Sequence, residues 1–368
     1  MIRVLVVDDS ATVREYLAYL LGQDPAIEVV GTARDGLEAV DQAERLKPGV
    51  IVMDVHMPRM SGYEATRQIM ERVPTPIVMV SASSSRYEAT TAFEALKAGA
   101  LTVVEKPGGP DDPAQAESAR RIIETVKLMA EVKVVRRWPR SRDQGAGVGG
   151  QRELTVPQPP THVPRPHSKI RLIAVGGSTG APQVIADILA GLPHDLAAPI
   201  LIVQHIAPGF TGGFAEWLAQ GTPLAVKLAE PGEATRPGTV YLAPEGSQTG
   251  ITKDGRIRLT TEPAEDGFCP SASYLFQSVA EAYGRSAIGI LLTGMGRDGA
   301  AGLKRLRGAG GVTIAQDEES CVIFGMPQEA IRQGAVEHVL SPEQIVGAIR
   351  SLVTPVEGGW GRRPGDGG

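Results

Sequence analysis

The feature that most constrains the fold of this chain is a regular alternation of short apolar runs with helical patterns along its first third. Apolar runs of strand length occupy residues 2–7, 27–31, 50–53, 77–80 and 101–104. Apolar residues with helical spacing follow each run, at residues 11–21, 36–46, 62–71, 87–98 and 114–133. Strands that alternate with helices in this way form a parallel sheet covered on both faces. We therefore expect an N-terminal α/β domain with a five-stranded, doubly wound parallel sheet.

A second alternation begins at Ile170 and contains several short strands in its middle. Strands are predicted at residues 170–175, 199–203, 224–228, 239–242, 249–252, 256–260, 287–292 and 312–315. Helices are predicted at residues 181–190, 271–283, 300–308, 326–333 and 342–352. The strands at 249–252 and 256–260 are joined through Asp254-Gly255, a turn typical of hairpins. The second domain is therefore expected to be a mostly parallel α/β domain with an antiparallel insert.

The two alternations are separated by a segment rich in proline, glycine and arginine. This segment lacks apolar periodicity, so it cannot bury enough apolar surface to fold, and we interpret it as a linker. The last residues are equally rich in glycine and are expected to be a disordered tail. The predicted organisation is a first domain at 1–125, a helix extension and linker at 126–168, a second domain at 169–353 and a tail at 354–368.

Charge and composition exclude several classes of protein. The net charge is −5, and only the linker carries more basic than acidic residues, so neither domain has the basic surface that nucleic-acid binding requires. Every apolar run is of strand length, and no leader precedes the first strand, which predicts no membrane insertion. Two cysteines, Cys269 and Cys321, can form neither a disulfide framework nor a four-ligand zinc site. We expect a cytoplasmic protein.

Polar side chains follow the strands of the first domain at the edge where parallel sheets bind ligands. Asp8 and Asp9 follow the first strand, Asp54 the third, Ser81 the fourth and Lys106 the fifth. Three converging carboxylates repel one another unless a hard cation such as Mg²⁺ is bound between them. A lysine beside them can pair with a phosphoryl group, and a hydroxyl can donate a hydrogen bond to one.

These residues stand in motifs that resemble those of the receiver domains of two-component response regulators. The motifs are Asp8-Asp9-Ser10, Met53-Asp54-Val55-His56-Met57-Pro58, Val80-Ser81-Ala82 and Lys106-Pro107. The resemblance covers about residues 1–125 and implies a flavodoxin-like fold. Val103 stands where many receivers carry an aromatic residue.

The resemblance to receivers also implies a role for each residue at this edge. Asp54 is the expected phospho-acceptor, and a histidine kinase is the expected phosphodonor. Asp8, Asp9, Asp54 and the backbone carbonyl of His56 are the expected Mg²⁺ ligands. Ser81 and Lys106 are expected to contact the phosphoryl group, and the bond between Lys106 and Pro107 to be a cis peptide.

Three residues with hydrolytic potential follow strands of the second domain. Ser178 lies in a Gly-x-Ser-x-Gly turn between a strand and a helix, which exposes its hydroxyl at a helix N-terminus. His205 follows the next strand, where a neutral imidazole can accept the serine proton. Asp298 follows a later strand and can orient that imidazole. Alone, each has a simpler interpretation: the glycine-rich turn as a phosphate loop, Asp298 as a helix N-cap, and His205 as a structural histidine.

Their motifs resemble those of the chemotaxis protein-glutamate methylesterase family. The motifs are Gly177-Ser178-Thr179-Gly180, Val203-Gln204-His205 and Leu292-Thr293-Gly294-Met295-Gly296-Arg297-Asp298-Gly299, with Arg297 where relatives commonly carry Asn. The resemblance implies that Ser178 is the nucleophile, His205 the general base and Asp298 its orienting partner. It also suggests Thr179 and the Met295 backbone N–H as oxyanion or positioning groups.

The function implied is hydrolysis of glutamate methyl esters, and deamidation of glutamines, on methylated chemoreceptors. A Ser-His-Asp mechanism needs no cofactor for hydrolysis, whereas phosphorylation of the receiver requires Mg²⁺ and is expected to regulate the hydrolase. Two other functions compete with this one. The chain could be a transcriptional regulator with a DNA-binding second domain, or a phosphate-accepting protein that has lost esterase activity.

Overall fold

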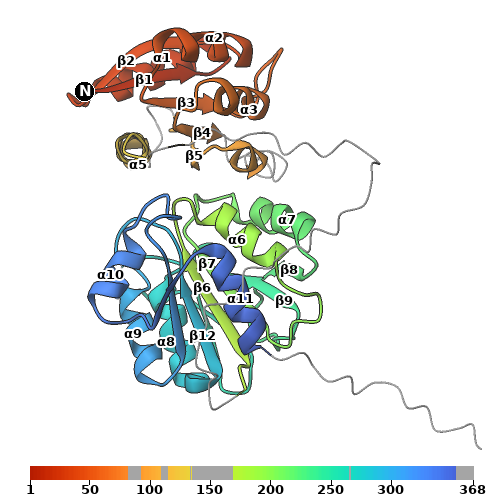
Figure 1. The fold of residues 1–368 in the computed structure, drawn as a ribbon. Helices are drawn as coiled ribbons and strands as arrows, with labels where there is room; N and C mark the ends of the chain where they lie inside the picture. The colour runs from red at the N-terminus through yellow and green to blue at the C-terminus, as the bar shows by residue number, and fades with distance from the viewer. Residues whose placement is uncertain (82–92, 109–114, 133, 135–168, 265–266, 354–368) are drawn as a thin grey trace, which may run out of the picture. The chain divides into compact units, whose positions relative to one another are not determined.

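The structure is a computed structural model, and it describes residues 1–81, 93–108, 115–132, 134, 169–264 and 267–353 (Figure 1). The described residues form two parallel sheets, one in residues 1–132, called here the N-terminal unit, and one in residues 169–353, called the C-terminal unit. Of the predicted helix extension and linker at 126–168, residues 133 and 135–168 lie outside the described residues, as does the predicted tail at 354–368, so the proposed domain bounds remain predictions. Of the helix predicted at 87–98, residues 93–98 are described and are helical.

The N-terminal unit contains a five-stranded sheet in the order β2-β1-β3-β4-β5, and all of its strand pairs are parallel. Its strands are β1 (Ile2–Val7), β2 (Ile27–Ala33), β3 (Val50–Asp54), β4 (Ile77–Ser81) and β5 (Thr102–Glu105). Its described helices are α1 (Ala11–Gly22), α2 (Gly36–Leu46), α3 (Gly62–Arg72) and α5 (Gln115–Met129). The predicted doubly wound sheet is confirmed.

Capping side chains determine where three of these helices begin. Ser10, Asp35 and Ser61 precede α1, α2 and α3, and each side chain accepts the backbone N–H of the residue three positions later. At α3 the Glu64 side chain in turn accepts the backbone N–H of Ser61, which completes a capping box. Because these caps lie directly after β1, β2 and the β3 loop, they fix the carboxyl edge of the sheet.

The C-terminal unit contains a seven-stranded sheet in the order β14-β13-β12-β6-β7-β9-β8, again with parallel pairs throughout. Its strands are β6 (Leu172–Gly177), β7 (Ile200–Gln204), β8 (Ala225–Leu228), β9 (Thr239–Leu242), β12 (Ala287–Leu291), β13 (Val312–Gln316) and β14 (His338–Leu340). The antiparallel insert is the separate pair β10 (Gln248–Ile251) and β11 (Ile257–Thr260). The predicted class of this domain is therefore confirmed.

Helices on both faces bury the apolar side chains of this sheet. They are α6 (Ala181–Ala190), α7 (Thr211–Gly221), α8 (Ala272–Ala282), α9 (Ala300–Gly308), α10 (Met326–Arg332) and α11 (Pro342–Leu352), with a short 3-10 helix η1 at Gly284–Ser286. One core cluster includes Leu201 on β7, Phe276 on α8 and Leu303 on α9, all of them buried. None of the helices in the described ranges is both long and apolar enough to cross a lipid bilayer.

Three elements of the C-terminal unit were not predicted, namely α7, β14 and the three-residue η1. Helix α7 begins with Thr211-Gly212-Gly213, and each glycine lowers helix propensity by about 1 kcal/mol, which hides the helical spacing of Phe214, Trp217 and Leu218. Strand β14 has only three residues, too few for an apolar alternation to be recognised.

The predicted cis peptide between Lys106 and Pro107 is wrong. Among the described residues the cis peptide is Cys269–Pro270. The two isomers of an X–Pro bond differ by only about 0.5–1 kcal/mol, so the local sequence does not decide between them.

Candidate functional site

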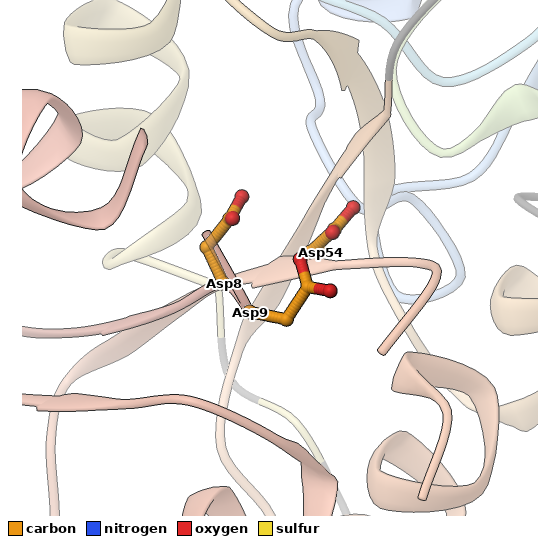
Figure 2. A group of neighbouring side chains, drawn as sticks. All are labelled: Asp8, Asp9 and Asp54. Carbon is orange, nitrogen blue, oxygen red and sulfur yellow. The ribbon is translucent and has the colours of Figure 1, made fainter. Parts of the chain in front are cut away.

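The acidic residues of the N-terminal unit converge at the carboxyl edge of its sheet (Figure 2). Asp8 follows the last residue of β1, and Asp54 is the last residue of β3. These two strands are paired with Val7 opposite Met53, so the two aspartates are neighbours. Asp8 and Asp54 are buried, whereas Asp9 is exposed, and a carboxylate oxygen of each lies within 4.8 Å of the others.

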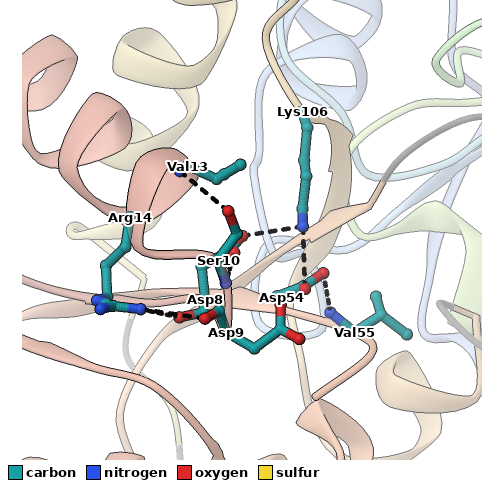
Figure 3. Close-up of polar contacts among 8 residues, drawn as sticks. All are labelled: Asp8, Asp9, Ser10, Val13, Arg14, Asp54, Val55 and Lys106. Atoms are coloured by element: carbon teal, nitrogen blue, oxygen red, sulfur yellow. Dashed lines mark hydrogen bonds and ion pairs between the residues drawn. The ribbon is translucent and has the colours of Figure 1, made fainter. Parts of the chain in front are cut away.

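Lys106 reaches into this cluster from the segment after β5 (Figure 3). Its Nζ lies 2.9 Å from Asp8 Oδ2 and 2.9 Å from Asp54 Oδ2. The Lys106 backbone N–H donates to the carbonyl of Ser81, which is the buried last residue of β4. The structure therefore brings together the side chains of Asp8, Asp9, Asp54 and Lys106, and the backbone of Ser81 lies beside Lys106.

Burial and ion pairing change the pKa values of both Asp54 and Lys106. Burial raises the pKa of the Asp54 carboxyl, although the ammonium of Lys106 opposes this shift. Burial also lowers the pKa of Lys106, but its contacts with Asp8 and Asp54 more than offset burial, so the pKa lies above its ordinary value. Lys106 therefore stays charged at neutral pH.

Backbone contacts orient the carboxylates. Asp8 Oδ1 accepts the Ser10 N–H at 2.9 Å, and Asp54 Oδ1 accepts the Val55 N–H at 2.8 Å. An Arg14 guanidinium nitrogen donates to the Asp8 carbonyl at 2.7 Å, which ties α1 to the end of β1 (Figure 3). One ammonium faces three carboxylates, so a divalent cation with oxygen ligands would balance the remaining charge. The donor set therefore fits Mg²⁺; the carbonyl of His56, on the loop after β3, remains a predicted ligand.

In the C-terminal unit, Ser178 and His205 follow neighbouring strands. Ser178 follows β6 and His205 follows β7, and the last residues of these strands, Gly177 and Gln204, are paired in register. Thr179 and the left-handed Gly180 (φ 81°) then lead into α6. The backbone therefore places the two residues side by side at the carboxyl edge.

Asp298 is fully buried and binds the first turn of α8. Its Oδ1 accepts the Ser271 hydroxyl at 2.8 Å and the Ser273 N–H at 2.9 Å, and its Oδ2 accepts the Ala272 N–H at 2.7 Å. The N-cap of the helix that follows is Gly299, so Asp298 does not cap its own helix. Asp298 instead satisfies the N-terminal N–H groups of another helix.

This helix terminus lies close to the strand that leads to Ser178. A methyl group added to Gly176 of β6 would come within 2.7 Å of the Ala272 Cβ. Only glycine permits this approach without displacement of α8. Asp298 therefore lies near the carboxyl end of β6.

The loop after β12, which also carries Asp298, follows the strand that pairs with β6 on the side opposite to β7. Its successive N–H groups are used in turn: Leu292 donates to Gly176 O at 2.8 Å, Thr293 to Gln316 Oε1 at 2.9 Å and Gly294 to Ile323 O at 3.0 Å. Within the described residues, the next N–H, that of Met295, has no hydrogen-bond acceptor in the protein. Met295 as a whole is 52% exposed.

Sequence reasoning missed the polar residues that hold this edge together. Ser271 and Gln316 are fully buried, and each contacts a loop that carries a candidate residue. A glutamine at the end of an otherwise apolar strand, as in Val312–Gln316, is the signal that could have found one of them, because a buried amide needs specific partners.

Comparison with known proteins gives matches to both units. A family model described as response regulator receiver domain matches residues 4–132, and one described as CheB methylesterase matches residues 173–349. A protein-glutamate methylesterase/protein-glutamine glutaminase of Geobacter metallireducens is 50% identical over 353 residues, which cover 96% of this chain and 99% of that protein. A relative of the same name from Nitrosospira multiformis is 48% identical over 353 residues, which cover 96% and 97% of the two chains. The crystal structure of the Thermotoga maritima CheB methylesterase catalytic domain is similar at 36% identity with a TM-score of 0.49, covering 50% of this chain and 100% of that one.

The two matched segments define a response regulator whose output domain is a hydrolase. Since relatives so named align along nearly their whole length, the chain belongs to the protein-glutamate methylesterase/protein-glutamine glutaminase family. The family resemblance predicted from the sequence is confirmed.

Proposed function

We propose that this protein hydrolyses glutamate methyl esters, and deamidates glutamines, on the cytoplasmic helices of chemoreceptors. The observation that carries the proposal is that Ser178 and His205 directly follow two strands paired in register. The names of the relatives support esters of protein glutamates and amides of protein glutamines as the substrates.

Ser178 and His205 are proposed to carry out the acyl transfer together. His205 removes the proton of the Ser178 hydroxyl as its oxygen attacks the ester or amide carbonyl. The protonated His205 then gives its proton to the departing methanol or ammonia. Water, activated by the same imidazole, releases the glutamate carboxylate and regenerates Ser178.

Asp298 and Met295 support this sequence without changing covalently. Four hydrogen-bond donors, including the Gly299 N–H at 2.8 Å, hold the Asp298 carboxylate in place. Asp298 is proposed to stabilise an imidazolium at His205. The Met295 N–H, with Thr179 beside Ser178, is suited to stabilise the oxyanion of the tetrahedral intermediate. None of these steps calls on a cofactor.

The N-terminal unit is proposed to receive a phosphoryl group on Asp54 from a histidine kinase. Asp8, Asp9, Asp54 and the His56 carbonyl would hold Mg²⁺, which neutralises charge on the incoming phosphoryl oxygens. Lys106 and Ser81 would pair with the transferred group. Its arrival would regulate hydrolysis in the other unit.

The test is release of methanol from methylated chemoreceptor membranes by the full chain. Ser178→Ala is expected to abolish release, while Ser351→Ala, an exposed serine on α11, is expected to have no effect. Regulation is tested by adding Mg²⁺ and a small phosphodonor, with Asp54→Asn as control. Methanol release that survives in a folded Ser178→Ala protein would refute the proposed function.

A further inference from the structure

Gln316, the last residue of β13, is a fully buried glutamine whose amide contacts two loops at once. Its Oε1 accepts the Thr293 N–H at 2.9 Å. Its Nε2 donates to the Ser320 carbonyl at 2.9 Å and to the Ser320 hydroxyl oxygen at 3.1 Å. A buried amide is stable only with such partners, so this side chain links the loop after β12 to the segment after β13.

The same two segments are joined again on the far side of Thr293. The Thr293 hydroxyl accepts the Ile323 N–H at 2.9 Å and donates to the Ile323 carbonyl at 3.1 Å. The Gly294 carbonyl accepts the N–H groups of Gly325 at 3.2 Å and Met326 at 2.9 Å. The backbone on the N-terminal side of Met295 is thereby held by a ladder of contacts.

Close packing fixes the position of the loop as well as its direction. A methyl group on Gly325 would lie 2.7 Å from the Gly294 carbonyl oxygen, 3.2 Å from the Gly296 nitrogen and 3.3 Å from the Met295 Cα. The segment from Gln316 to Gly325 therefore lies directly against the peptide units that flank Met295.

We propose that Gln316 is a positioning residue for hydrolysis, and that it acts by aiming the Met295 N–H through Thr293. This inference rests on the proposed function, because it assumes that the Met295 N–H stabilises the oxyanion formed beside Ser178. Such donors are effective when they are fixed before the reaction. The Gln316 side-chain amide holds Thr293, two residues before Met295, so it can change the rate without contacting substrate.

The two substrates would both depend on this arrangement. Methyl ester and primary amide pass through tetrahedral intermediates that carry the same oxyanion, whereas their leaving groups differ. Loss of Gln316 contacts is therefore expected to reduce ester hydrolysis and deamidation by the same factor.

The experiment compares Gln316→Met with Thr313→Val in the full chain. Gln316→Met keeps an unbranched side chain but loses both hydrogen-bond partners. Thr313→Val lies on the same buried strand, away from its carboxyl end, and loses the bond from the Glu337 N–H to its hydroxyl. We expect Gln316→Met to lower kcat about tenfold to a hundredfold with KM within about twofold, since removal of an entire oxyanion donor costs about 10²–10³-fold. Thr313→Val is expected to keep kcat within about twofold.

A second readout detects the position of the loop without activity. With ¹⁵N-methionine labelling, the Met295 amide signal is expected to shift in Gln316→Met and to stay in place in Thr313→Val. Gln316→Glu keeps an acceptor for the Thr293 N–H and is expected to retain more kcat than Gln316→Met. Should Gln316→Met fail to fold, Gly325→Ala displaces the same loop at the Gly294 carbonyl and the Gly296 nitrogen and is expected to lower kcat in the same way.

The outcomes separate this inference from the proposed function. An inactive Ser178→Ala together with equal kcat in Gln316→Met and Thr313→Val would overturn the inference alone. A change confined to KM, or an unmoved Met295 signal, would do the same. An active Ser178→Ala would overturn the proposed function itself.

Discussion

The Ala272 N–H donates a 2.7 Å hydrogen bond to Asp298 Oδ2, which ties the loop after β12 to the first turn of α8. The other carboxylate oxygen accepts from Ser271 and Ser273 in the same turn. Asp298 therefore stabilises the fold at the place where it is proposed to serve catalysis.

This double role predicts that Asp298→Ala lowers both stability and activity. Removal of the carboxylate leaves buried N–H groups of α8 without an acceptor, at a cost of about 1–3 kcal/mol in the free energy of unfolding. Because Ser178 and His205 remain, kcat is expected to fall less than in Ser178→Ala. Denaturant titration and methanol release measure the two effects. Asp195→Ala, an exposed carboxylate in the turn after α6, is the control, and an unchanged stability of Asp298→Ala would contradict the prediction.

Phosphorylation is expected to be confined to Asp54 and to require a divalent cation. Asp54→Asn should eliminate incorporation of phosphate from a phosphorylated histidine kinase, because an amide is not a nucleophile toward the phosphoryl group. A chelator should have the same effect on the unmodified protein, and Asp9→Ala should slow the transfer by weakening metal binding. Radiolabel transfer followed by peptide mapping measures both site and rate. Label on another residue, or equal transfer in chelator, would argue against this assignment.

Removal of the Lys106 charge is expected to strengthen Mg²⁺ binding and to weaken phosphoryl transfer. The ammonium lies 2.9 Å from Asp8 and Asp54, so it repels a cation bound to the same carboxylates. We expect Lys106→Met to bind Mg²⁺ at least about tenfold more tightly, which is ~1.4 kcal/mol. Lys127→Met, on α5, removes an ion pair with Asp24 and is the matched control. Calorimetric titration with Mg²⁺ gives the affinities, and equal affinities for the two variants would refute this explanation.

The two cysteines are expected to differ sharply in reactivity. Burial raises the pKa of the Cys321 thiol to about 12, so at pH 8 almost none of it is the reactive thiolate. Cys269 is exposed. Iodoacetamide at pH 8 should therefore label Cys269 in the folded protein, and both residues in denaturant. Mass spectrometry of the labelled peptides distinguishes them, and rapid native labelling of Cys321 would show that the 316–325 segment opens.

Most of the fold follows from periodicity, and most of the first site follows from strand ends. Asp8, Asp54, Ser81 and Lys106 could be placed together because parallel strands bring their carboxyl ends to one edge. The contacts of Asp298 could not be predicted, because its partners on α8 lie more than twenty residues earlier in the chain. The same holds for Gln316, whose role depends on which loop crosses the end of β13. Helix α7 was missed because its glycines weaken a local signal that tertiary packing overrides.

The pairing of Gly177 with Gln204 makes the hydrolytic site a reporter of correct strand register. A slip of one residue between β6 and β7 would move His205 by about 3.3 Å along the strand. It would also turn the wholly buried side chains of β7 to the opposite faces of the sheet. A misfolded or partly assembled C-terminal unit would therefore be catalytically silent, so specific activity measures the fraction of molecules that have reached the native sheet.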